Sequence, residues 1–123
     1  MNETTITIMG RDVRVRYCAA TETSFEEMTG KSIDVFIPTV ENEKVKEPAK
    51  ANRYDYLMLA IGGIIAAYLR EQKDAPITTD EILYDASPTE VMNLITTILN
   101  LRNEWYKVAD IVPEEEGNGK GKN

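Results

Sequence analysis

The sequence predicts a mainly α protein of the α+β class, in which an N-terminal β-hairpin packs on a small helical domain. Three observations predict it. Residues 4–18 alternate apolar and polar side chains with the period of a half-buried strand. Residues 57–69 are uncharged and largely apolar, and residues 87–90 read Ser-Pro-Thr-Glu, a typical helix start. At 123 residues the chain suits one modest core, so we expect a single domain over residues 1–110.

The hairpin is expected over about residues 4–18, with strands at 4–9 and 13–18. A two-residue loop at Gly10 and Arg11 suits a type II′ turn, which takes glycine at its first position. That loop gives three pairs on one face: Ile8 with Val13, Ile6 with Val15, and Thr4 with Tyr17. Because an isolated hairpin is marginally stable, this face must lie on other elements.

A first helix is expected over about residues 21–29. Phe25 and Met28 lie three positions apart and share one helical face. Gly30 supplies the left-handed residue that commonly ends a helix, and Ser32 can cap the turn that follows. From Pro38 to Ala51 the chain is polar and mixed in charge, which fits either a mobile loop or an added edge strand around Val40 and Val45.

The second helix is expected over residues 53–72. Asn52 can cap it, and Asp55 in its first turn is favoured by the helix dipole. Its middle is apolar on nearly every face, so the helix is either central to the core or covered by another subunit. Gly62 and Gly63 each cost about 1 kcal/mol relative to alanine inside a helix, which indicates the close approach of another element.

A short helix is expected over residues 79–84 with Thr78 or Thr79 as its cap. The last helix is expected over residues 88–107, because Ser87, Pro88 and Glu90 form a capping box and apolar residues at helical spacing follow. Residues 111–123 are rich in glutamate, glycine and lysine, and we expect them to form a disordered, flexible tail.

The net charge of −7 argues against nucleic acid as a partner, since affinity for phosphates comes largely from lysine and arginine. Arg14 and Arg16 point the same way on the second strand, and two such arginines usually keep a face solvated. The longest uncharged run has 13 residues, Leu57 to Leu69, whereas a membrane span needs roughly 20. The N-terminus has no secretion signal, so we expect a cytoplasmic protein with no membrane partner.

The sequence contains few of the residue patterns that are typical of enzyme active sites. Cys18 is the only cysteine and there is no histidine, so no intramolecular disulfide, ordinary zinc set or histidine-activated thiol is expected. The acidic pairs Glu26-Glu27 and Asp80-Glu81 are adjacent in sequence, so their side chains diverge on a helix instead of converging on one atom. We therefore expect no catalytic residue, metal or cofactor.

The segment from Ser24 to Phe36 reads Ser-Phe-Glu-Glu-Met-Thr-Gly-Lys-Ser-Ile-Asp-Val-Phe. It resembles the Phe-Glu-Glu-x-Thr-Gly-x-Ser segment of phage tail assembly chaperones. The resemblance extends upstream to Gly-Arg-Asp-Val-Arg-Val-Arg at residues 10–16 and downstream to the two long helices, so it covers most of residues 1–108. The segment between residues 38 and 51 is longer than the family pattern implies.

This resemblance implies a protein that holds the aggregation-prone tape-measure protein in the host cytoplasm and helps tail-tube protein assemble around it. The alternative is a small structural or adaptor subunit that self-associates through its apolar helix. In either case we expect contacts from apolar and aromatic residues of the two long helices: Leu57, Ile61, Ile64, Ile65, Trp105 and Tyr106. Trp105 and Tyr106 are equally suited to the protein's own core, and the spacing of Trp105 from Ile98 and Arg102 continues the buried stripe.

Overall fold

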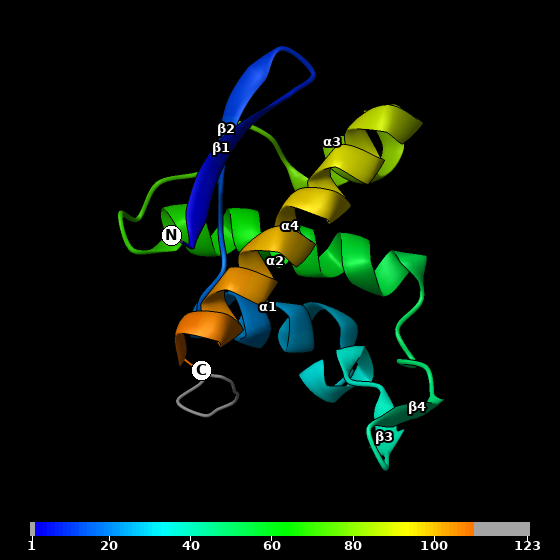
Figure 1. Ribbon diagram of the computed structural model, residues 1–123. Coiled ribbons are helices and arrows are strands. Elements are labelled where there is room, and N and C mark those ends of the chain that lie inside the picture. The colour runs from blue at the N-terminus through cyan, green and yellow to red at the C-terminus, as the bar shows by residue number, and fades with distance from the viewer. Residues whose placement is uncertain (1, 110–123) are drawn as a thin grey trace.

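The computed structural model describes residues 2–109 and has the predicted mainly α architecture. An N-terminal hairpin precedes the helices, and two long helices, α2 and α4, cross in the body of the molecule (Figure 1). The elements follow in the order β1 (Glu3–Ile8), β2 (Arg11–Arg16), α1 (Ala19–Thr29), η1 (Ile33–Phe36), β3 (Thr39–Glu41), β4 (Lys44–Glu47), α2 (Arg53–Leu69), α3 (Thr79–Asp85) and α4 (Pro88–Ala109). The predicted tail at residues 111–123 lies outside the described residues.

The hairpin of β1 and β2 forms as predicted, but the predicted register was wrong by two residues. Ile8 pairs with Arg11, Ile6 with Val13 and Thr4 with Val15. The turn is Met9-Gly10, and both residues have positive φ values, 52° and 77°. Two left-handed residues define a type I′ turn, for which glycine at the second position is favourable. A shift of two keeps every side chain on its predicted face, so Val13, Val15 and Tyr17 are still buried.

Helix α1 begins two residues before its predicted start because Thr21 anchors its first turn. The Thr21 hydroxyl accepts a hydrogen bond from the Cys18 amide at 3.1 Å and donates one to the Arg16 carbonyl at 2.7 Å. The predicted stop is confirmed: Gly30 is left-handed, with a φ of 71°. Ser32 then caps η1 by accepting a hydrogen bond from the Asp34 amide at 3.1 Å.

Helix α2 is the central element, and it ends at Leu69, three residues before its predicted end. Asn52 and Asp55 form the predicted cap, in which each side chain accepts a hydrogen bond from the other residue's amide. The two glycines lie against neighbouring elements. A Cβ atom added at Gly62 would lie 2.8 Å from the Thr21 carbonyl oxygen in α1, and one at Gly63 would lie 3.0 Å from the Arg16 carbonyl oxygen. Close approach, as predicted, accounts for both.

Helix α3 is capped by Thr78 and helix α4 by Ser87. The glutamate three residues after each cap, Glu81 or Glu90, also contacts the N-terminal hairpin. Glu90 accepts hydrogen bonds from the Ser87 amide at 3.0 Å and from the Met9 amide at 2.6 Å. These two backbone donors hold the pKa of Glu90 below its usual value. Glu81 accepts from the Thr78 amide and pairs with Arg11 at 2.8 Å. The turn of the hairpin is thereby fixed to two helix N-termini.

The segment from Pro38 to Ala51, for which a loop and a strand were both considered, contains a second hairpin. Val40 pairs with Val45 and Glu41 with Lys44, around a turn whose two residues, Asn42 and Glu43, have positive φ values. The two strands form a separate sheet from β1 and β2.

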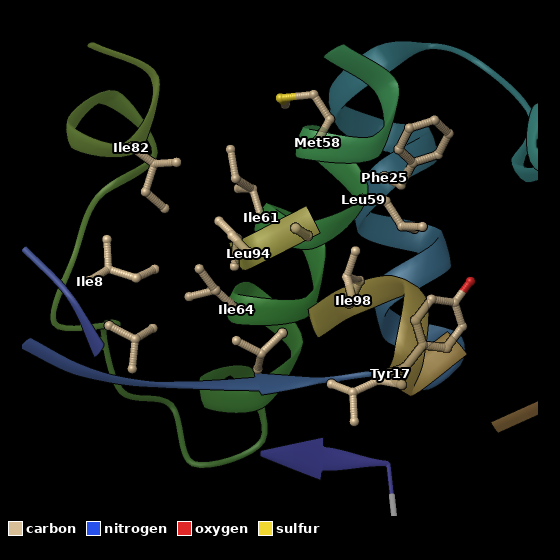
Figure 2. Close-up of a cluster of buried hydrophobic side chains, with 14 of the residues drawn as sticks. Ile8, Tyr17, Phe25, Met58, Leu59, Ile61, Ile64, Ile82, Leu94 and Ile98 are labelled. Atoms are coloured by element: carbon tan, nitrogen blue, oxygen red, sulfur yellow. The ribbon is translucent and has the colours of Figure 1, made fainter. Parts of the chain in front are cut away.

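The core lies between α2, α4 and the inner face of the N-terminal hairpin. Figure 2 shows Ile61 and Ile64 of α2 facing Leu94 and Ile98 of α4. Ile8 of β1 and Ile82 of α3 lie at one end of this cluster, and Tyr17, Phe25 and Leu59 lie toward the other. The apolar surface of α2 is thus covered largely by the chain's own elements, which is one of the two arrangements predicted for it.

Candidate protein-interaction surface

The four residues of α2 that the sequence nominates for partner contacts do not form an exposed patch. Ile61 and Ile64 are buried in the core, with 1% and 2% of their surface exposed. Leu57 and Ile65 are half-buried and pack against the same core. A partner contact for these residues remains a prediction, and in this conformation it would involve the edges of Leu57 and Ile65.

Trp105 and Tyr106 lie together near the C-terminal end of α4, where they contact Tyr17, directly after β2, and Glu22 of α1. The Trp105 ring lies 5.4 Å from the Tyr17 ring and 4.9 Å from the Tyr106 ring, measured between centroids. Tyr106 and Tyr17 both donate hydrogen bonds to Glu22. Trp105 is half-buried by this cluster, whereas Tyr106 keeps 39% of its surface exposed.

One group of exposed apolar residues lies on and directly before the second hairpin. All seven residues of β3 and β4 are exposed, and the two strands make extensive contacts only with each other among the described elements. In Figure 1 this hairpin lies beyond η1, apart from α4. We call three exposed apolar residues the hairpin surface: Ile37, two positions before β3, and Val40 and Val45 in the strands, with 56%, 56% and 64% of their surfaces exposed.

Local geometry explains how this hairpin holds its shape with so little packing. The left-handed turn at Asn42 and Glu43 matches the twist of the strands, and Lys46 pairs with Glu41 at 2.8 Å. Val40 and Val45 face each other, so they share one side of the hairpin. The hairpin's edges are poor templates for strand addition, because β3 has three residues and follows Pro38. The apolar side of the hairpin is therefore better suited to protein contact than its strand edges.

A hollow of about 440 Å³ lies beside the hairpin surface, at the base of β3. Its lining includes Val35 of η1, Ile37, Pro38 and Lys50. A partner side chain could enter it while contacting Ile37. A second set of exposed apolar residues lies on α3 and α4: Leu83, Tyr84 and Met92.

The hairpin surface consists of apolar side chains bordered by charged ones. Across residues 2–109, no group of three or more cysteine, aspartate or glutamate side chains could hold a metal ion. Also within those residues, no helix is long and apolar enough to cross a membrane.

Sequence reasoning named Val40 and Val45 as a possible strand but did not nominate them for binding. The signal was present: two valines stand in a segment otherwise dominated by glutamate and lysine, around an Asn-Glu pair. Ile37 carried no comparable signal, because it directly follows the apolar Val35-Phe36 pair.

Comparisons of the chain with protein-family models, with curated proteins and with solved structures found no match.

Proposed function

We propose that this protein is a phage tail assembly chaperone that binds the tape-measure protein in the host cytoplasm and assists assembly of tail-tube protein around it. The observation that carries the proposal is the hairpin surface: Ile37, Val40 and Val45 are exposed beside a well-packed core. Exposed apolar residues that the fold itself does not use are typical of protein-interaction sites.

Charge supports the same function. The chain has a net charge of −7, which keeps a protein dissolved while it covers an apolar segment of another. The hairpin surface is bordered by charged residues of β3 and β4, including Glu41, Lys44 and Lys46. Contact through such a surface suits reversible binding, as required of a chaperone that leaves before the tail is complete.

The second candidate is a structural or adaptor subunit that self-associates through its apolar helix. The burial of Ile61 and Ile64 leaves the middle of α2 little free apolar surface for another copy in this conformation, and the exposed Tyr54 and Leu69 lie at opposite ends of the helix. We therefore place this candidate second. The two functions differ in stoichiometry, because a structural subunit stays in the finished particle and a chaperone does not.

Co-expression tests the proposal. The tape-measure protein encoded in the same phage or prophage is expressed as fragments, with and without this protein, and the soluble fraction is measured. We expect more soluble tape-measure protein in its presence and co-purification of the two. Equal insolubility in both cases would contradict the chaperone function. Detection of this protein in stoichiometric amounts in finished particles would favour the structural subunit.

A further inference from the structure

A second pocket, of about 510 Å³, lies where β1, β2, α1 and α2 meet. It is lined by the two strands, by the first turn of α1 and by the C-terminal end of α2, and two carboxylates, those of Glu3 and Glu71, are part of its lining. Arg14 and Arg16 of β2 and Arg70 after α2 supply its positive charge. Two arginines on a strand usually only keep a face solvated, but here a third arginine and a cavity accompany them.

The ion pairs in this pocket leave positive charge in excess. Arg14 donates two hydrogen bonds to Glu71, at 2.9 and 3.0 Å, and Arg16 donates one to Glu3 at 3.2 Å. Arg70 has no carboxylate partner among the described residues. Three guanidinium groups against two carboxylates give the pocket one positive charge, whereas the whole chain carries −7.

The pocket also retains unused donors. A guanidinium group has five N–H donors in a planar fork, so the bonds to Glu3 and Glu71 do not exhaust Arg14 and Arg16. Helix α1 begins at the pocket with Ala19 and Ala20, and its N-terminus adds the positive end of the helix dipole. These groups favour a carboxylate.

The remaining lining suits the aliphatic part of a ligand. Alanine side chains of α1 and α2 form a small apolar wall: Ala19, Ala20, Ala66 and Ala67. The volume of about 510 Å³ far exceeds the roughly 30 Å³ of one water molecule, so the pocket has room for more than an isolated small anion. A glutamate side chain combines the two required features, a methylene stem and a terminal carboxylate.

We propose that this pocket binds an acidic segment of another polypeptide, whose glutamate or aspartate carboxylates pair with Arg70 and with the unused donors of Arg14 and Arg16. The site is separate from the hairpin surface and does not depend on the identity of the partner bound there. It gives the protein a second, electrostatic mode of recognition, and its binding weakens as salt increases.

The test is a titration of the full-length, ¹⁵N-labelled protein with the peptide acetyl-Ala-Glu-Ala-Glu-Ala-amide, followed by NMR. The readouts are the amide signals of Ala19 and Ala20 and the guanidinium Nε–H signals of Arg14, Arg16 and Arg70. We expect saturable shifts at these groups. The matching peptide with glutamine in place of glutamate is expected to give none, and equal shifts with both peptides would overturn the proposal.

Charge variants localise the binding. Arg70→Gln should lower the affinity for the glutamate peptide about five-fold, as expected for the loss of one exposed ion pair. Arg53→Gln removes the same charge from the opposite end of α2 and should change affinity by less than about two-fold. Equal weakening by both variants would show a general charge effect and overturn the proposed site. Both proteins are first compared by chemical denaturation to establish that they are folded.

Two further experiments test whether another ligand occupies this pocket. The chain has its own acidic run at residues 114–116. If Glu114→Gln, Glu115→Gln and Glu116→Gln together move the pocket signals without any peptide, the occupant is this chain's own segment and not a partner's. If an oligothymidylate moves the same signals more strongly than the glutamate peptide, the site recognises phosphates. Either result would overturn the proposal.

Discussion

The hydroxyl group of Tyr106, near the end of α4, donates a hydrogen bond to the carboxylate of Glu22 in α1, 84 positions earlier in the chain. Tyr17, just after β2, donates to the same carboxylate oxygen at 2.7 Å. Arg102 lies over the Tyr106 ring, 4.7 Å from its centroid. One carboxylate therefore joins the N-terminal hairpin, α1 and α4.

Replacing Tyr106 by phenylalanine tests this junction. The substitution removes the hydrogen bond to Glu22 and keeps the ring, so we expect the free energy of unfolding to fall by about 1 kcal/mol in urea denaturation. Tyr84→Phe is the matched control. That tyrosine is 82% exposed, and its substitution should change stability by less than about 0.5 kcal/mol. Equal effects of the two changes would contradict a role for the Glu22 bond.

Tyr17 gives a prediction about alkaline pH. Burial, followed by the hydrogen bond to Glu22, raises the pKa of Tyr17 well above its ordinary value of 10.0. Above about pH 10 the unfolded chain loses this proton while the folded protein keeps it, so the free energy of unfolding falls as pH rises.

In Tyr17→Phe we expect a shallower fall in unfolding free energy between about pH 9 and 11 than in the wild type. The measurement is chemical denaturation at a series of pH values. Tyr84→Phe should keep the wild-type slope, because that side chain is exposed. An unchanged slope in Tyr17→Phe would show that Tyr17 ionises alike in the folded and unfolded protein.

The packing of α1 on α2 predicts the sign of a glycine substitution. Alanine at position 62 would place its Cβ 2.8 Å from the Thr21 carbonyl oxygen, a backbone atom that cannot move without displacing α1. We expect Gly62→Ala to destabilise the protein by about 1–3 kcal/mol in urea denaturation. If this face of α2 were free, the same change would stabilise the helix by about 1 kcal/mol.

Ile61 distinguishes a core residue from a partner-facing one. It is 1% exposed and faces α4 (Figure 2), so Ile61→Ala should cost about 2–5 kcal/mol of unfolding free energy. Ile37→Ala, at a position 56% exposed, is the control and should change stability by less than about 0.5 kcal/mol. Wild-type unfolding of Ile61→Ala would assign this side chain to a partner surface instead.

Local signals in the sequence predicted most of the fold. The caps at Asn52 and Ser87 and the stop at Gly30 depend on neighbouring residues, so they could be predicted without knowledge of the tertiary structure. The register of the first hairpin could not be predicted in this way, because glycine suits either turn type. Met9 adopts a left-handed conformation that is unusual for methionine, so nothing in the sequence indicated it. Both registers place the valines inward, which is why the faces were still correct.

The candidate site was harder to predict, because exposure depends on which elements pack together. The apolar sequence of α2 led to the prediction of a binding surface there, but other elements of the same chain cover Ile61 and Ile64. Val40 and Val45 have the same apolar character, but among the elements of residues 2–109 none covers them, and they are 56% and 64% exposed. Periodicity predicted the strand that contains Val13 and Val15, but it did not decide between a loop and a strand around Val40 and Val45, and it does not show which of these side chains another element covers.

The central claim is that the hairpin surface binds the tape-measure protein, and its most direct test is the soluble yield of a tape-measure fragment co-expressed with a hairpin variant. The variant combines Val40→Thr with Val45→Thr, which keeps strand propensity and removes apolar contact. Met92→Thr, at a position of α4 that is 48% exposed and lies outside both proposed binding sites, is the control. We predict wild-type yield with the control, and for the hairpin variant a yield as low as in the absence of this protein. Wild-type yield with the hairpin variant would contradict the claim.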